Sequence, residues 1–482
     1  SRETPTVNHP EPYTPKQLEE ACVDGLKAAG LPVAAVYLDT KALKGGYICA
    51  TFRVKIEYTS GANTNFPSTM VLKSEAPGSG DHDTALAFDL YNREWNFYER
   101  VSQRVPVRVP KYYATAVLGG RGIGVLMEDL TQYANCTLNP KLDLPGILLT
   151  VEHLAKLHAE FWADTSLTPA SCGLHPVNHY RIIKEKVEGF WPAFKRNWSS
   201  RLSEAELDVC QRIMANFGWI QDELSKAPAT LMHGDVKPGN MAFLKGNDGK
   251  DTPVFFDWQY PKLGKGVIDV VFFLVEGYEP AYQRQIEEQV KHHYLTSLKR
   301  FGVVGYGPDD LARDWKLALM YFPILASFWF GATDEADLVD PTFPLRFVPR
   351  TMDAITRNRA ADILPEFSIN VLIPMAGDGT RFSNVGYQLP KPLIPVGGKP
   401  MISWVLENMD MTSLDAKDDT VQLNVQQKFF CVVRSEHEEK FQISSVLRSL
   451  NKDVQTVKVN GLTEGPACTA LLARDLIDSN TP

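Results

Sequence analysis

The stretch Leu231-Met232-His233-Gly234-Asp235-Val236-Lys237-Pro238-Gly239-Asn240 is followed, seventeen residues after Asn240, by Asp257 within Val254-Phe255-Phe256-Asp257-Trp258-Gln259. Apolar residues precede each motif, as expected for short strands that end in loops. An Asp on a tight, Gly-containing loop can accept the proton of a hydroxyl group. An Asn one turn later and an Asp at a strand end offer the oxygen atoms that Mg²⁺ prefers.

These side chains suit the transfer of a phosphoryl group, which depends mainly on positioning and charge. Asp235 is the predicted base, and Lys237 is predicted to neutralise charge on the transferred group. Asn240 and Asp257 are the predicted Mg²⁺ ligands. A structural loop in which Asp235 only caps a helix would explain His-Gly-Asp alone equally well. The three further residues at this spacing favour the chemical interpretation.

This set resembles the aminoglycoside phosphotransferase and choline kinase superfamily, especially its CHK or ecdysteroid-kinase-like branch, over about residues 20–360. The resemblance implies an α+β, protein-kinase-like bilobal domain that uses ATP and Mg²⁺. It also implies that Asp269 steadies the catalytic loop. Leu154–Trp162 resembles the helix that begins the family's large lobe, and we expect His158 on it to be a core histidine.

The resemblance extends to the preceding part of the chain. Lys73 stands where the family has its strand lysine, and Glu94 on the next helix would pair with it to orient the phosphates of ATP. Gly45 and Gly46 fit the hairpin over the phosphates, although Gly-Gly alone is often only a turn. Glu128 lies in the expected linker between the lobes, whose backbone would meet adenine.

The acceptor site is less clear from the sequence. Aromatic and acidic side chains bind cationic alcohols well, and Trp258, Trp329 and Asp334 are candidates by position. Core packing is the favoured interpretation of the two Trp residues. Choline, ethanolamine, a sugar and a sterol-like alcohol all remain open as acceptors.

The rest of the chain fits two domains after an N-terminal arm. Residues 1–20 form the predicted arm, and β-type runs at Ile48–Tyr58 and Thr69–Leu72 predict antiparallel hairpins. We expect a helix carrying Phe88, Tyr91, Trp95 and Tyr98. The predicted kinase-like domain spans 21–362, with a small lobe over about 21–130 and a largely helical large lobe over about 131–362. A break near Ile363–Glu366 precedes a second domain over 367–482.

The second domain begins with Leu372-Ile373-Pro374-Met375-Ala376-Gly377-Asp378-Gly379-Thr380-Arg381-Phe382 and continues to Pro390-Lys391-Pro392. A strand that ends in a Gly-rich turn lets backbone amides approach phosphates. These motifs resemble the sugar-nucleotide pyrophosphorylase and phosphocholine cytidylyltransferase superfamily, which implies an α/β Rossmann-like nucleotidyltransferase domain that binds CTP or another nucleoside triphosphate. The residues implied in binding are Gly377, Gly379, Thr380, Arg381 and Lys391.

The resemblance stops at Pro482, before the family's metal-binding Asp and acceptor half. A degenerate domain and a longer parent polypeptide are both open, and the clean motifs favour the longer parent. We expect residues 1–482 alone not to catalyse nucleotidyl transfer.

Composition excludes several classes. The 44% hydrophobic and 22% charged residues are ordinary for a globular protein, and a net charge of −8 argues against nucleic acid as a partner. Seven scattered Cys residues without a CxxC pair favour the cytoplasm or another reducing compartment. The longest apolar run, Phe322–Ala332, is too short to span a membrane. Because the chain begins at Ser1, N-terminal targeting cannot be judged, and protein partners are unknown.

Three functional hypotheses follow, of which the least favoured makes nucleotidyl transfer the main activity and the kinase domain an accessory. The leading one is a bifunctional enzyme whose first domain phosphorylates a small alcohol and whose second domain would activate the product. The alternative is a binding or assembly subunit that uses the kinase fold with little turnover.

Overall fold

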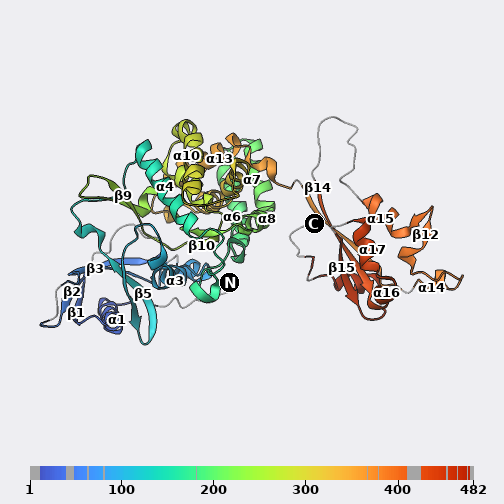
Figure 1. The fold of residues 1–482 in the computed structure, drawn as a ribbon, viewed down its shortest axis with the longest axis horizontal. Coiled ribbons are helices and arrows are strands. Elements are labelled where there is room, and N and C mark those ends of the chain that lie inside the picture. Colours follow the sequence, from blue (N-terminus) through green and yellow to red (C-terminus); the bar gives the residue numbers. More distant parts are fainter. Residues whose placement is uncertain are drawn as a thin grey trace, which may run out of the picture. The chain divides into compact units, whose positions relative to one another are not determined.

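The computed structural model describes residues 11–39, 48–61, 65–79, 82–180, 182–365, 367–377, 379–409, 425–451, 454–463, 465–474 and 476–477. The chain divides into two compact units, Ser1–Ile363 and Leu364–Pro482. Figure 1 labels their elements. The first unit contains the His233–Asn240 loop, and each unit is described by itself.

A five-stranded antiparallel sheet forms the small lobe of the first unit, in the order β1-β2-β3-β5-β4. The strands are β1 (Val33–Leu38), β2 (Ala50–Tyr58), β3 (Thr69–Ser74), β4 (Tyr112–Leu118) and β5 (Arg121–Glu128). The expected pairing of the two β-type runs is confirmed, because β2 and β3 pair with Thr51 opposite Lys73. Lys73 therefore lies near the end of β3, a central strand that pairs with β2 on one side and with β5 on the other.

Helix α1 (Pro15–Ala28) packs against β4 and completes the apolar core of the small lobe. It begins five residues before the predicted end of the arm. The reason is a capping box: the Thr14 side chain accepts from Gln17 N, and the Gln17 side chain accepts from Thr14 N. Such caps satisfy backbone groups that a helix end leaves open.

The aromatic helix expected around Phe88–Tyr98 is interrupted. Helix α2 (His82–Ala87) and helix α3 (Leu90–Asn96) are separated at Asp89, which has φ 55°. The helix continues from α3 as a π-turn at Phe97–Val101 and a 3₁₀ turn at Ser102–Arg104. The aromatic spacing predicted the helix, but it carried no sign of the left-handed residue.

The large lobe is mainly helical, as expected. Its helices are α4 (Leu144–Glu160), α5 (Pro169–Cys172), α6 (Ile182–Trp198), α7 (Glu204–Ala215), α8 (Phe217–Ser225), α9 (Val267–Gly277), α10 (Pro280–Arg300), α11 (Pro308–Leu319), α12 (Phe322–Ala332) and α13 (Phe343–Arg357). In Figure 1 they gather on one side of the small-lobe sheet.

The segment Pro308–Ala332 is long and apolar enough to pass as a membrane span by length and composition. However, 78% of its most apolar window is buried inside the protein. The segment is also divided into α11 and α12, and it packs on α6, α9 and α13. These are the properties of core helices of a folded domain.

Short strands in the large lobe carry the motif. β7 (Thr230–Met232) pairs antiparallel with β10 (Lys262–Gly264). β6 (Cys136–Leu138), β8 (Met241–Lys245) and β9 (Asp251–Phe255) form a second antiparallel sheet. The His233–Asn240 loop thus lies between two sheets, and Asp257 follows β9.

The second unit is built on a parallel sheet in the order β11-β14-β15. Its strands are β11 (Phe367–Pro374), β14 (Val425–Arg434) and β15 (Val454–Val459), with a small hairpin of β12 (Pro395–Val396) and β13 (Lys399–Pro400). The helices are α14 (Thr380–Ser383), α15 (Met401–Met409), α16 (Ser435–Phe441), α17 (Ile443–Leu450) and α18 (Pro466–Leu471). The strand expected before the Gly-rich turn is β11.

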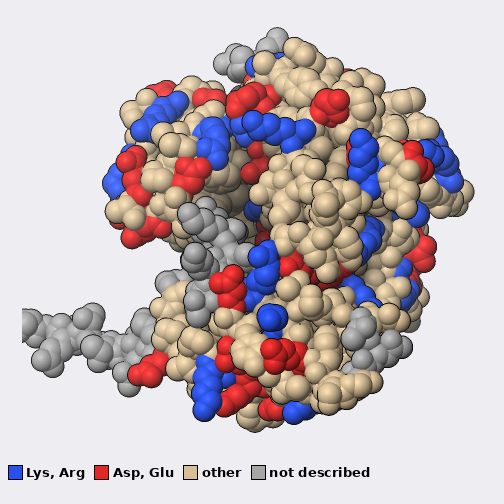
Figure 2. Space-filling view, turned by 90° about the vertical axis from the view of Figure 1, so that its left-hand side faces the viewer, with Lys and Arg blue, Asp and Glu red and all other residues tan. Residues whose placement is uncertain are grey.

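Lys and Arg side chains are mixed with Asp and Glu side chains over the described surface that Figure 2 shows. They do not gather into one basic stripe on this face. A stripe of that kind would be the electrostatic sign of nucleic-acid binding.

Candidate active site

The loop between β7 and β8 has a backbone that only glycine can adopt at its second residue. Gly234 has φ +85°, and a Cβ placed there would lie 2.1 Å from the carbonyl oxygen of Tyr260. The adjacent His233 accepts from Asp235 N through Nδ1 at 3.3 Å and donates through Nε2 to Phe256 O at 3.0 Å. Burial lowers the pKa of His233, which favours this neutral form.

Asp269 fixes the backbone of this loop through hydrogen bonds. Its fully buried carboxylate accepts from His233 N at 2.8 Å and from Gly234 N at 2.7 Å. His158 Nε2 also lies 3.1 Å from this carboxylate, and its Nδ1 lies 2.9 Å from Tyr294 Oη. His158 is fully buried, so the expectation of a core histidine is confirmed. The same contacts bear out the expectation that Asp269 steadies the loop.

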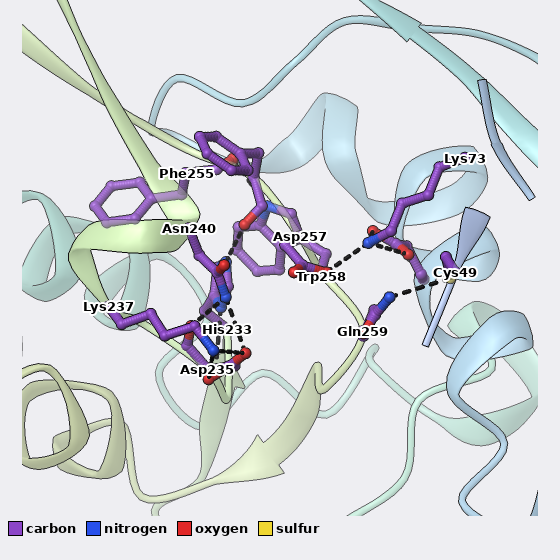
Figure 3. Close-up of polar contacts among 12 residues, drawn as sticks. Cys49, Lys73, His233, Asp235, Lys237, Asn240, Phe255, Asp257, Trp258 and Gln259 are labelled. Carbon is purple, nitrogen blue, oxygen red and sulfur yellow. Dashed lines mark hydrogen bonds and ion pairs between the residues drawn. The ribbon is translucent and has the colours of Figure 1, made fainter. Parts of the chain in front are cut away.

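The carboxylate of Asp235 is surrounded by donors. Lys237 Nζ lies 3.0 Å from Asp235 Oδ2, and Asn240 Nδ2 donates to the same oxygen at 2.9 Å. Figure 3 shows both side chains pointing to Asp235. Burial raises the pKa of Asp235 to about 6, and the charge of Lys237 opposes this rise. A carboxylate with this pKa is a stronger base than an exposed one and is still ionised at neutral pH.

Lys73 pairs with Glu94 of its own lobe and with Asp257 of the large lobe, and the second contact joins the two lobes. Its Nζ lies 2.8 Å from the Glu94 carboxylate on α3. It also lies 2.5 Å from Asp257 Oδ1, and Figure 3 draws this contact as a dashed line. Burial would lower the pKa of Lys73, but Asp257 and Glu94 outweigh it and raise the pKa well above its ordinary value. Burial likewise raises the pKa of Asp257, yet Lys73 outweighs this and the net shift is downward. The lysine is therefore a cation and Asp257 an anion at neutral pH.

The donor atoms of Asn240 and Asp257 suit Mg²⁺. Asn240 uses its Nδ2 on Asp235, and no described residue donates to its Oδ1. Asp257 Oδ2 likewise accepts no hydrogen bond from a described residue. An amide oxygen and a carboxylate oxygen are ligands that Mg²⁺ prefers. Asp257 has φ 65°, a left-handed conformation that Asp tolerates better than most residues.

A cavity of about 420 Å³ opens beside these groups. Asp235, Lys237, Asn240 and Asp257 line it together. The sequence-predicted catalytic and metal-binding residues, which lie up to 22 positions apart, thus share one wall of one cavity. The same wall includes Glu276 of α9.

The three acceptor candidates differ in position. Trp329 lines the cavity, where it stacks against Phe88. Trp258 is fully buried, stacks on Phe97 at 3.8 Å and lies outside the cavity, so its assignment to core packing is confirmed. Asp334 lines a different pocket from the one that Asp235 lines, so its role as an acceptor ligand stays a prediction.

Glu128, Gly45 and Gly46 are the other residues of the first unit that were predicted to contact the nucleotide. The carboxylate of Glu128 is held by Arg108 at 2.5 Å and by Lys111 N at 3.0 Å. Its side chain is therefore occupied, and only its backbone is left to meet a base. Gly45 and Gly46 lie outside the described residues.

Two cavity residues were missed by sequence reasoning. Arg93 on α3 and Lys262 on β10 are fully buried and line the cavity. Arg93 directly precedes Glu94, so the helix that was predicted to supply one site residue supplies two. No sequence pattern pointed to Lys262, because its place in the cavity lining depends on the pairing of β10 with β7.

In the second unit, the two predicted motifs lie side by side. Gly379 has φ +62° and begins α14, and a Cβ placed there would lie 3.6 Å from Cβ of Lys391. Lys391 Nζ lies 5.7 Å from the ring centre of Phe382. Arg381 and Thr380 lie in α14, and Gly377 lies between β11 and α14.

Several solved structures are similar to this chain. An ethanolamine kinase of Plasmodium vivax is 13% identical, with 67% of this chain and 81% of that chain covered and a TM-score of 0.37. A choline kinase of Streptococcus pneumoniae is 12% identical, with 68% and 96% covered and a TM-score of 0.42. A microcompartment-associated aminopropanol kinase is 12% identical, with 70% and 98% covered and a TM-score of 0.45. Similarity at this level does not define a substrate.

A comparison with curated proteins finds no match. A family model does match, and it covers residues 44–302, from the Gly45-Gly46 segment to the end of α10. This range includes Lys73, Glu94, the loop of Asp235, Asp257 and Asp269. Because the match spans more than half of the 482 residues, the chain belongs to the ecdysteroid kinase-like family.

Proposed function

We propose that the first unit transfers the γ-phosphoryl group of ATP to a hydroxyl group of a small molecule. The observation that carries this proposal is the shared cavity wall. A buried carboxylate with a raised pKa, a lysine and two Mg²⁺-type ligands face the same 420 Å³ space. The family's kinase-like character supports the same reaction.

Each residue has a role that follows from its contacts. Asp235 accepts the proton of the acceptor hydroxyl as the hydroxyl oxygen attacks phosphorus. Lys237, beside Asp235, lowers the negative charge that the incoming phosphates meet. Lys73, oriented by Glu94, binds the α- and β-phosphates. Asn240 and Asp257 would hold Mg²⁺, which supplies charge neutralisation to the phosphates when bound.

The test is ADP release by the whole chain with ATP, Mg²⁺ and a panel of neutral, cationic and anionic alcohols. Acceptor-dependent ADP release, with a phosphorylated product seen by mass spectrometry, is the expected result. Binding of ATP without turnover on any acceptor would instead favour the binding or assembly subunit.

The pH dependence of this reaction follows from Asp235. The base acts in its ionised form, and burial raises its pKa to about 6. We expect kcat/KM to fall about tenfold per pH unit below about pH 6 and to level off above about pH 7. The measurement is ADP release between pH 5 and 8.5, with fluorescence at each pH to show that the chain stays folded. A flat profile across this range would exclude Asp235 as the base.

A second candidate function belongs to the second unit. We propose that it binds CTP or another nucleoside triphosphate through Gly377, Gly379, Thr380, Arg381 and Lys391. The supporting observation is that the turn at Gly379 lies against Lys391 at the carboxyl end of β11. A parallel strand followed by a Gly-containing turn leaves backbone N–H groups free for phosphate.

Replacing Lys391 with Ala should weaken nucleotide binding by the second unit about 10- to 100-fold, because a charge-assisted hydrogen bond contributes about 1.5–3 kcal/mol. The measurement is titration of labelled CTP, GTP and UTP into the whole chain carrying Asp257→Ala, which weakens nucleotide binding by the first unit. Lys399→Ala, in the nearby β13, is the control. Equal affinity in the Lys391 and Lys399 variants would contradict the assignment.

A further inference from the structure

We propose that the buried end of the cavity is an anion site formed by Arg93 and Lys262, so that the acceptor is an apolar hydroxy compound with a carboxylate. The inference deepens the proposed kinase function and rests on it for the role of the hydroxyl group. It concerns the part of the cavity that the phosphoryl-transfer residues leave free.

Arg93 is a buried guanidinium with unused donors. Its Nη2 donates to Phe88 O, and its plane lies over the ring of Tyr180 at 3.7 Å. Its Nε and Nη1 are buried and have no hydrogen-bond partner among the described residues. No described carboxylate lies within ion-pair distance of it. A buried charge without an acidic partner is costly to the fold, and a bound anion would offset that cost.

Lys262 is a second buried basic residue of the cavity lining. Its Nζ contacts Tyr321 Oη at 3.2 Å and lies within 5.8 Å of the ring centres of Tyr260, Tyr321 and Phe322. No ion pair joins it to a described carboxylate. Burial and the charge of Arg93 lower the pKa of Lys262 to about 7, although the more distant carboxylates of Asp269 and Asp235 oppose this shift. An anion placed between the two residues would raise this pKa and keep the ammonium charged.

The other two basic side chains that line the cavity each pair with a carboxylate. Lys237 pairs with Asp235, and Arg346 pairs with Asp340 at 2.8 Å. Glu276 is near enough to Lys237 to oppose the effect of burial on its pKa, and Asp337 is exposed. Among the described lining residues, the cations without an acidic partner are therefore Arg93 and Lys262, both at the buried end.

The cavity lining also includes many apolar side chains besides the phosphoryl-transfer residues and the basic pair Arg93 and Lys262. These apolar side chains come mainly from α6, α9 and α12 and include Phe88, Ile183, Phe272, Phe322, Leu325 and Trp329. An acceptor with an apolar body would bury well against them. The unpaired guanidinium of Arg93, together with Lys262 in its protonated form, disfavours a cationic acceptor such as choline, since like charges in a buried site repel each other strongly.

The test compares three acceptors of equal length with the whole chain: ω-hydroxydodecanoate, its methyl ester and ω-aminododecanol. We expect kcat/KM, measured by ADP release, to be about 10- to 100-fold higher for the carboxylate than for the ester, and lowest for the amine. Lys262→Met should raise KM for the carboxylate by a similar factor and leave KM for the ester within about threefold. Lys299→Met, on the exposed side of α10, is the matched control.

Calorimetric titration of ω-hydroxydodecanoate separates this inference from the kinase function. Binding that takes up protons near pH 8 and weakens in Lys262→Met supports the anion site even where no acceptor is phosphorylated. Turnover of the ester equal to that of the carboxylate, with no effect of Lys262→Met, overturns the anion site and leaves the kinase function standing. Arg93→Gln, if it folds, should act in the same direction as Lys262→Met.

Discussion

Replacing Asp235 with Asn is expected to lower acceptor-dependent ADP release by about 10²- to 10⁴-fold, the usual contribution of a positioned base. The substitution keeps the shape of the side chain and an oxygen that can accept from Asn240 Nδ2. It removes the carboxylate that we propose as the acceptor of the hydroxyl proton. Affinity for ATP should change by less than about threefold, because Lys73, which would bind the phosphates, and Asp257, which would hold Mg²⁺, both remain.

Folding should survive this substitution. Lys237 loses its closest carboxylate, but Glu276 and Asp257 still act on its charge. Asp251→Asn, an exposed position at the start of β9, is the matched control and should keep full activity. More than a tenth of the original rate in Asp235→Asn, with the protein folded, would show that another group accepts the proton.

Replacing Asp269 with Ala is expected to lower the stability of the first unit by about 3–5 kcal/mol. The substitution leaves His233 N, Gly234 N and His158 Nε2 without an acceptor in a fully buried site. Urea unfolding followed by Trp fluorescence measures the effect, because eight of the nine Trp residues precede Leu364.

Asp309→Ala supplies the comparison for this loss. Asp309 is exposed in the first turn of α11, and we expect its removal to change stability by less than about 1 kcal/mol. Asp269→Asn should fall between the two, since an amide keeps one acceptor oxygen and turns its NH₂ toward donors. Equal unfolding midpoints for Asp269→Ala and Asp309→Ala would mean that the loop is held by other contacts.

The residue types of the His233–Asn240 loop could be predicted as a site because they lie close together in the sequence. His233 to Asn240 is one loop, and the type and spacing of its side chains determine what it can bind. The same holds for the Gly377–Arg381 turn. Lys73 and Glu94 were within reach of prediction because each lies at a recognisable place on a strand or helix.

The break at Asp89 and the early start of α1 were harder to predict. Asp89 adopts φ 55° between two helices, and an Asp elsewhere in a helical pattern looks the same in sequence. The Thr14–Gln17 capping box was visible, yet the Pro-rich composition around it favoured an arm.

The sequence by itself determined that a loop with Asp235, Lys237 and Asn240 precedes a strand that is followed by Asp257. Only the tertiary structure decided what surrounds that loop: the cavity, the burial that raises the pKa of Asp235, and the basic side chains of Arg93 and Lys262 without a paired carboxylate. The physical reason is that donor atoms and backbone turns are properties of short segments. Burial and the absence of a partner charge depend on which distant segments pack together, and these two factors shift pKa values and select ligands.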